Sequence, residues 1–300
     1  MELTNFTKYK NSIYMPHLLR IIPAGENTKL SPRSGLVKEQ LGKTPGMYHP
    51  DEGEKWWTGH HDFTKFRAKD AYLDTWEDQQ AECGVIPMGM QTGWEVVVSD
   101  IDSDRLEFIV MARAAVEAVV GKAVVVRRRQ GSDRIQLFYR VKPNMEPITK
   151  SYTKHKREGD PEKVFHLVEV LGRGQQTVIE GPNAKGKMHY WQNGQGLLGN
   201  EDNMPQITRA QCAEVLKLIE YGAEFCLVGY TKVKGGGLAH LVNDNRPAFK
   251  IDDPNSELLA QDLEMLKAAI AKIDITDERL SDYDTWLLLF RAMWAACGGI

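Results

Sequence analysis

The stretch WEVVVSDID, residues 94–102, decides how the rest of the chain is interpreted. Its continuous valine run predicts a strand from Trp94 to Ile101 that is buried on both faces. Side chains two apart in a strand point the same way, so Asp100 and Asp102 leave the strand end together. Their carboxylates are hard oxygen ligands that suit Mg²⁺ or Mn²⁺. An Asp-x-Asp pair alone is unspecific, because turns and helix caps also use aspartate.

Further elements are predicted on both sides of this strand. A helix begins near Ser103 or Asp104, either of which can cap it, and ends at Gly121. A hairpin follows, joined by turn residues 130–133. This order predicts an α+β fold, a sheet with helices on one face. The other predicted elements are helices over residues 69–81 and 207–221, strands over 123–128, 134–141, 164–170 and 176–179, and a loop over 142–162.

Glu169 is a candidate third carboxylate. It stands in the apolar run Leu167–Leu171, where an unpaired charge is costly. A glutamate there needs a metal, an arginine or a sheet face open to solvent, and half-exposed strands commonly take the last option. In a continuous strand His166 lies on the opposite face from Glu169, so we expect this histidine to lie outside the acidic site.

Arginines flank the predicted hairpin turn at Arg127, Arg128, Arg129 and Arg134. Guanidinium groups bind phosphate oxygens through two parallel hydrogen bonds. Strand alternation puts Arg127 and Arg129 on one face and Arg128 on the other, so only part of the set can serve one site. A basic edge that discourages sheet aggregation is the alternative interpretation. Lys43, in a turn with Gly and Pro, is a further candidate for binding phosphate.

Length and composition exclude several classes of protein. The 300 residues suffice for about two domains, and 42% hydrophobic with 26% charged residues excludes a mainly disordered or collagen-like chain. Four cysteines without a C-x-x-C pair predict neither a disulfide framework nor a zinc ribbon. The sequence holds neither the roughly 20 apolar residues of a membrane span nor a signal-peptide core, so we expect a cytoplasmic protein without a membrane partner.

Positive charge is concentrated in one segment of the chain. The whole chain has a net charge of −3, whereas residues 122–187 hold fifteen Lys and Arg against seven Asp and Glu. Such a basic island predicts an anionic partner, either nucleic acid or nucleotide phosphate. A solvated face that merely keeps the protein soluble is the other interpretation.

An ordered set of motifs gives these residues a wider context. In chain order they are Ile22-Pro23, Gly42–Pro45, Thr92-Gly93, Val98–Asp102, Val168–Val178, Gly181-Pro182, Gly186 and Tyr190-Trp191. With this set, the segment from about Leu19 to Trp191 resembles the bifunctional primase-polymerase (prim-pol) domains of the archaeo-eukaryotic primase superfamily, found in phage and plasmid replication proteins. The resemblance implies an RRM-like catalytic sheet.

The resemblance also implies an activity and its partners. It implies DNA primase and DNA polymerase chemistry, in which nucleotides from nucleoside triphosphates are joined on a single-stranded DNA template, with or without a primer. Asp100, Asp102 and Glu169 would be the catalytic acids and would bind two Mg²⁺ or Mn²⁺ ions. The nucleotide-binding residues would be Lys43, Arg127, Arg128, Arg129, Ser132, Arg134, Gln136 and Gln176.

One motif departs from the family pattern. The family's second motif usually ends in Ser-x-His, whose histidine contacts the nucleotide phosphates. The matching residues here are Ser132, Asp133 and Arg134. We therefore expect Arg134 to replace the histidine, with Gln136 as the second choice. The departure also leaves open the alternative that the enzyme has reduced activity.

Two other functions remain open. One is a non-catalytic DNA-binding module of a replicative primase-helicase, which would bind DNA even without the carboxylates. The other is a glycosyltransferase that uses Mn²⁺ with an Asp-x-Asp pair. That class needs a nucleotide-binding α/β sheet near the N-terminus, and the turn-rich first ninety residues do not predict one.

The sequence also predicts how the chain is divided. We expect a catalytic domain over residues 1–230, a glycine-containing linker over 231–254 and a small all-helical module over 255–300. The module begins with a capped amphipathic helix, and its second helix, over residues 283–296, has more apolar side chains than one contact face needs. We therefore expect a truncated module and, from the resemblance, a helicase domain further along the full-length chain in the host cell cytoplasm.

Overall fold

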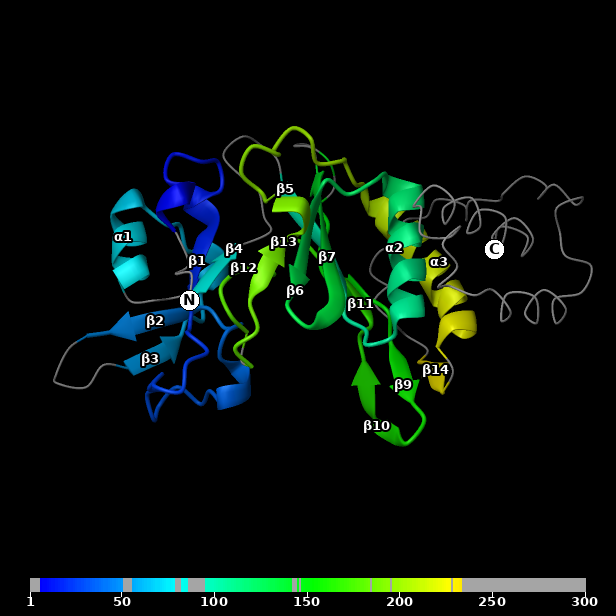
Figure 1. The fold of residues 1–300 in the computed structure, drawn as a ribbon, viewed down its shortest axis with the longest axis horizontal. Coiled ribbons are helices and arrows are strands. Elements are labelled where there is room, and N and C mark those ends of the chain that lie inside the picture. Colours follow the sequence, from blue (N-terminus) through cyan, green and yellow to red (C-terminus); the bar gives the residue numbers. More distant parts are fainter. Residues whose placement is uncertain are drawn as a thin grey trace, which may run out of the picture. The chain divides into compact units, whose positions relative to one another are not determined.

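The computed structural model describes residues 6–50, 56–78, 82–85, 95–141, 145, 147–183, 185–194, 196–227 and 229–233. Its α-helices are α1 (Asp70–Asp78), α2 (Leu106–Val120) and α3 (Arg209–Cys226), and short 3₁₀ turns occur elsewhere in the described chain. These residues form an α+β fold with several sheets and few helices, as the sequence predicts (Figure 1). The strands are β1 (Leu18–Ile21), β2 (Gly46–His49), β3 (Trp56–Gly59), β4 (Glu82–Val85), β5 (Glu95–Ile101), β6 (Val125–Arg129), β7 (Ser132–Val141), β8 (Ser151–Tyr152), β9 (His155–Arg157), β10 (Asp160–Phe165), β11 (Val168–Leu171), β12 (Thr177–Glu180), β13 (His189–Trp191) and β14 (Tyr230–Lys232).

The chain divides into two compact units, each made of three separate segments. The boundary between the units falls inside β5 and inside β11. Asp100 therefore belongs to the first unit, whereas Asp102 and Glu169 belong to the second. The first unit comprises Met1–Asp100, Ala123–Lys150 and Val170–Thr208, and the second comprises Ile101–Lys122, Ser151–Glu169 and the chain from Arg209 onward.

The first unit is built on a sheet with the strand order β13-β6-β7-β5-β11. Strand β6 pairs antiparallel with both β13 and β7. Strand β5 is buried on both faces from Glu95 to Ser99, as its valine run predicts. Val96 and Val98 pack into the main hydrophobic cluster with Val125 and Phe138. Because β5 is held on both sides, the half-buried Asp100 near its end has a rigid support.

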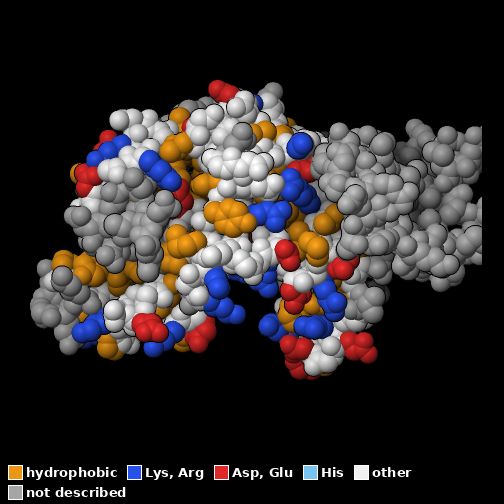
Figure 2. All heavy atoms as spheres, in the orientation of Figure 1, with side chains coloured by type: hydrophobic (Ala, Val, Ile, Leu, Met, Phe, Trp, Pro, Cys, Tyr) orange, Lys and Arg blue, Asp and Glu red, His pale blue; other side chains and the backbone are white. Residues whose placement is uncertain are grey.

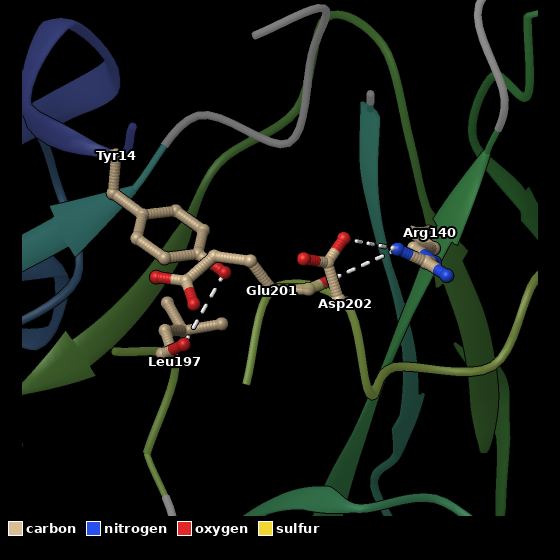
Figure 3. Close-up of polar contacts among 5 residues, drawn as sticks. All are labelled: Tyr14, Arg140, Leu197, Glu201 and Asp202. Carbon is tan, nitrogen blue, oxygen red and sulfur yellow. Dashed lines mark hydrogen bonds and ion pairs between the residues drawn. The ribbon is translucent and has the colours of Figure 1, made fainter. Parts of the chain in front are cut away.

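A polar cluster in the first unit ties its N-terminal segment and β7 to the loop after β13 (Figure 3). The hydroxyl of Tyr14 donates a hydrogen bond to the carbonyl of Leu197 at 3.3 Å, and burial raises the pKa of this hydroxyl. The guanidinium of Arg140, near the end of β7, donates to the carbonyl of Glu201 at 3.1 Å and to Oδ1 of Asp202 at 3.2 Å. Together with the backbone bridge between Arg140 and Gln206, these bonds fix the end of β7.

The second unit packs α2 against α3, which lie side by side (Figure 1). A Cβ atom on Gly222 of α3 would lie 2.5 Å from Sδ of Met111 on α2, so the glycine permits their close approach. Gly121, with φ of 108°, follows the last residue of α2, as predicted. The same unit holds the sheet β10-β9-β14. The start of β11 is bonded to the chain after β8, where the amide of Thr153 donates to the carbonyl of Val168 at 3.0 Å.

The prediction of a loop over residues 142–162 was wrong. Its described residues include β8, β9 and the start of β10. Strands β9 and β10 pair antiparallel, and Gly159 lies in their turn with φ of 88°. Five of the six residues of β10 are exposed. The strand therefore has no buried face, and it lacks the apolar alternation by which a strand is found in a sequence.

The predicted linker beyond residue 233 and the whole helical module over 255–300 lie outside the described residues. Elements α1, β5, β12 and α3 agree with the predictions to within about five residues. The strand predicted over 164–170 is instead divided between β10 and β11, and the N-cap of α2 is Arg105 rather than Ser103 or Asp104. Among the described residues, no helix is both long and apolar enough to cross a membrane.

Candidate functional site

In the first unit, Asp100 lies within electrostatic reach of Arg127 on β6. Burial lowers the pKa of Arg127 to about 10; the charge of Asp100 raises it and that of Arg129 lowers it. The guanidinium of Arg127 also donates a hydrogen bond to the carbonyl of Val178 on β12. Arg127 therefore links the end of β5 to β12, through an attraction that low solvent exposure strengthens.

The arginines of the β6–β7 hairpin divide between its two faces. Nε of Arg128 donates to Oε1 of Gln192 at 3.0 Å, whereas Nη2 of Arg129 donates to Oγ of Ser132 at 3.3 Å. The charges of Arg127 and Arg129 both lower the pKa of His189, and that of Arg129 also lowers the pKa of Arg127. The two arginines therefore lie on one face of the strand, as alternation predicts. The turn is shorter than predicted, because Ser132 already belongs to β7. The amide of Arg134 donates to Oγ of Ser132 at 3.3 Å.

His189 joins this group, although sequence reasoning did not assign it to the site. It is the register partner of Arg129 across β13 and β6. Its Nδ1 donates to the carbonyl of Gly181 at 3.0 Å. Burial and then the charge of Arg127 lower its pKa to about 3, so the imidazole is neutral at pH 7. The pairing joins residues 60 positions apart, and no local sequence pattern reports it.

Other predicted nucleotide-binding residues of the first unit meet in pairs. Nε2 of Gln176 donates to the carbonyl of Lys43 at 2.6 Å, and the Lys43 side chain is exposed. Gln136 is 5% exposed, and its Oε1 accepts a hydrogen bond from the hydroxyl of Thr177 at 2.8 Å. Gln136 thus joins β7 to β12 from the interior, while Lys43 is open to solvent.

In the second unit, Asp102 and Glu169 come from neighbouring chain segments. The amide of Asp102 donates to the carbonyl of Leu167 at 2.9 Å, two residues before Glu169. Asp102 is exposed, and the side chain of Glu169 is 20% exposed. Two carboxylates with partial access to solvent therefore lie on chain segments that are joined by a backbone hydrogen bond.

The prediction for His166 was wrong. Its Nδ1 lies 3.1 Å from Oε1 of Glu169, so the two residues are partners rather than residues of opposite faces. Strand β10 ends at Phe165 and β11 begins at Val168, so the alternation is interrupted between them. The ring of His166 stacks on Tyr152, with centroids 4.2 Å apart and an angle of 24°. This contact fixes the imidazole that faces Glu169.

No group of three or more His, Cys, Asp or Glu side chains among the described residues is arranged as a metal site. Comparison with known proteins gives no further guide: no family model, no curated protein and no solved structure matches the chain. The candidate site therefore rests on the residues themselves. They are Asp100, Arg127, Arg129 and His189 in the first unit, and Asp102, His166 and Glu169 in the second.

Proposed function

We propose that this chain is a primase-polymerase with a prim-pol fold, which joins nucleotides on a single-stranded DNA template. The observation that carries the proposal is the bond from the amide of Asp102 to the carbonyl of Leu167. It brings Asp102, the second residue of the Asp-x-Asp pair, beside the segment that holds Glu169, 67 residues further along the chain. Carboxylates from distant parts of the sequence must meet in this way to serve one reaction centre.

The proposed reaction is a nucleotidyl transfer. The 3′-hydroxyl oxygen of a primer, or of an initiating nucleotide, forms a bond to the α-phosphorus of a nucleoside triphosphate. The bond from that phosphorus to the bridging oxygen breaks, pyrophosphate leaves with the electron pair, and the hydroxyl proton passes to solvent. Three carboxylates, on Asp100, Asp102 and Glu169, are a donor set that suits Mg²⁺ or Mn²⁺, which when bound would offset the charge of the phosphates.

The basic residues have separate parts in this proposal. Arg127 is buried and bonded to Val178, so its role is to hold the Asp100 strand end rather than to bind a ligand directly. Arg129 and Arg134 are only half-buried and can reach the phosphates, with Lys43 as the exposed third cation. Neutral His189, beside Arg129, already donates through Nδ1 to Gly181, so its Nε2 can accept one hydrogen bond without adding charge.

The test is nucleotide incorporation by the double variant Asp100→Ala with Asp102→Ala. We expect incorporation to be abolished while the melting temperature stays close to that of the wild type. Asp104→Ala is the matched control, because Asp104 is an exposed aspartate of the same segment without an assigned role. If the double variant extends a primer at the wild-type rate, the assignment of the carboxylates is wrong.

A non-catalytic DNA-binding module is the second candidate, and the Ser132-Asp133-Arg134 departure from the family's Ser-x-His favours it. It predicts that the wild type incorporates no nucleotide with either Mg²⁺ or Mn²⁺. It also predicts that the double variant binds single-stranded DNA as tightly as the wild type. Incorporation by the wild type that depends on Asp100 and Asp102 excludes this candidate.

A further inference from the structure

The first unit contains a pocket of about 360 Å³ among β1, β2 and α1, apart from every residue assigned to the candidate site. This volume lies at the lower end of the range of ligand pockets, about 300–1,000 Å³. Six of its eleven lining residues carry an aromatic or imidazole ring. They are Tyr48, His49, His60, Phe66, Tyr72 and Trp76.

Three of these rings form a stepped platform. The planes of Phe66 and Tyr72 are 25° apart with centroids at 6.2 Å, and those of Tyr72 and Trp76 are 27° apart with centroids at 6.1 Å. Tyr72 and Trp76 are four residues apart on α1, so the helix itself holds them on one face. Trp76 is 5% exposed, whereas Tyr72 is 39% exposed. The platform is thus anchored by Trp76 and accessible at Tyr72.

The positive charge of Arg20 beside the pocket affects which flat ligands the pocket can bind. Arg20 lies over the ring of Trp57 at 5.1 Å and over that of Trp76 at 5.8 Å, and its Nε donates to the carbonyl of Gly46 at 3.3 Å. Burial lowers its pKa to about 10, so it is still charged at pH 7. The described lining residues include no Asp or Glu. A cationic ligand is therefore disfavoured, although aromatic cages otherwise suit such ligands.

The polar groups of the pocket suit the edge of a heterocycle. Burial lowers the pKa of His60, so at pH 7 its ring is neutral and has one donor and one acceptor. Nε2 of His49 lies 3.0 Å from the hydroxyl of Thr58, so this ring is also fixed. A flat face for stacking, the neutral imidazole of His60 and a nearby positive charge together match a base that carries a phosphate.

We propose that this pocket binds a nucleobase, stacked on Tyr72, with Arg20 providing attraction for the attached phosphate. The base can belong to a free nucleotide or to single-stranded DNA, which share this chemistry. The proposal rests on the pocket alone and does not depend on nucleotidyl transfer at Asp100 and Asp102.

The test compares two probes on the full chain. Binding of AMP is measured by calorimetry, and binding of a labelled oligothymidylate by fluorescence anisotropy. Base stacking on an aromatic side chain corresponds to about a 5- to 140-fold change in Kd on alanine substitution. We expect Tyr72→Ala to weaken at least one probe within this range, and the probe that is weakened identifies the source of the base. Tyr72→Phe, which keeps the ring, should bind like the wild type.

Val37→Ala is the matched control, because Val37 is a 54% exposed apolar residue of the same unit that does not line the pocket. Ultraviolet crosslinking with an oligonucleotide that carries 5-iodouracil should label Tyr72 or Trp76, also in the Asp100→Ala, Asp102→Ala variant. That variant separates the two proposals, since crosslinking in an inactive enzyme cannot come from catalysis. Unchanged affinity of both probes in Tyr72→Ala, or an equal loss in Val37→Ala, overturns the proposal.

Discussion

The basic island of the sequence contains two hairpins whose cationic side chains have different surroundings. In the β6–β7 hairpin of the first unit, Arg127, Arg128 and Arg129 are half-buried, and each donates to a defined oxygen. In the β9–β10 hairpin of the second unit, the cations lie over aromatic rings. Nζ of Lys163 is 4.8 Å from the centroid of Phe165, and the guanidinium of Arg157 is 5.9 Å from that of Tyr230.

The difference shows that a count of charges does not identify a binding surface. The guanidinium of Arg127 has already exchanged water for the carbonyl of Val178, so it contributes to stability and is not available to a new phosphate. An exposed lysine over a ring keeps its hydration and can exchange it for a phosphate. Basic and acidic side chains together cover the β9–β10 hairpin in Figure 2, so its exposed cations are not one uniform patch.

The strongest test of this comparison is the stability of Arg127→Met against that of Lys156→Met. Loss of the Arg127 guanidinium removes its hydrogen bond to the carbonyl of Val178 and its attraction to the charge of Asp100. We expect the free energy of unfolding to fall by about 3 kcal/mol, the magnitude typical of a broken buried ionic contact. Lys156→Met should change it by less than about 0.5 kcal/mol. Urea unfolding measures both.

An equal loss in both variants would mean that the two hairpins do not differ in burial. The methionine keeps much of the arginine's volume, so the comparison reports the lost charge and hydrogen bond rather than a cavity.

Local pattern predicted the parts of the site that lie within one element. The valines of β5 predicted its burial on both faces, and alternation separated Arg128 from Arg127 and Arg129. The predictions that failed concern contacts between distant segments or breaks in a strand. His189 meets Arg129 only through strand pairing, and His166 meets Glu169 because the chain leaves its strand before Val168.

Each hairpin also has a buried neutral histidine beside it, which predicts sensitivity to acid. Burial first and a neighbouring cation second lower the pKa from 6.5 to about 3 for His189, beside Arg127, and to about 4 for His155, beside Lys232. Below pH 6.5 the unfolded chain takes up protons that the folded chain does not. The free energy of unfolding should therefore fall as the pH drops from 6.5 toward 4, by up to about 1.4 kcal/mol per pH unit for each histidine.

Substitution of each histidine in turn shows how much of this acid sensitivity comes from each hairpin. His155 is 2% exposed, and its ring nitrogens have no hydrogen-bond partner among the described residues. His155→Leu should therefore keep the stability at pH 7 and reduce the loss at pH 5. His189→Leu should reduce the loss at pH 5 but give up the bond to Gly181. Urea unfolding at the two pH values tests this, and an unchanged pH slope in both variants would contradict it.

We expect the half-buried arginines to differ in how much they contribute to nucleotide affinity. Arg134→Ala should raise the KM for the nucleoside triphosphate about tenfold, the loss of roughly one charge-assisted hydrogen bond, with a smaller effect on the Kd for DNA. Arg128→Ala should change KM less, because that guanidinium already binds Gln192. Steady-state kinetics and anisotropy measure the two constants. Equal effects of Arg134→Ala on KM and Kd would indicate a diffuse basic surface instead of a nucleotide site.

The smallest expected effect concerns two cations of the β9–β10 hairpin, the half-buried Lys156 and the exposed Lys163. If Lys156 and Lys163 contact phosphates of single-stranded DNA, each change to alanine should lower the slope of log K against log salt by about 0.7. At a fixed salt concentration this is only a change of a few fold in Kd, so the slope is the better measure. Lys163→Arg keeps the charge over Phe165 and should keep the slope. Lys217→Ala, an exposed lysine of α3, is the matched control. If it lowers the slope as much as the hairpin variants do, the hairpin is not a preferred DNA contact.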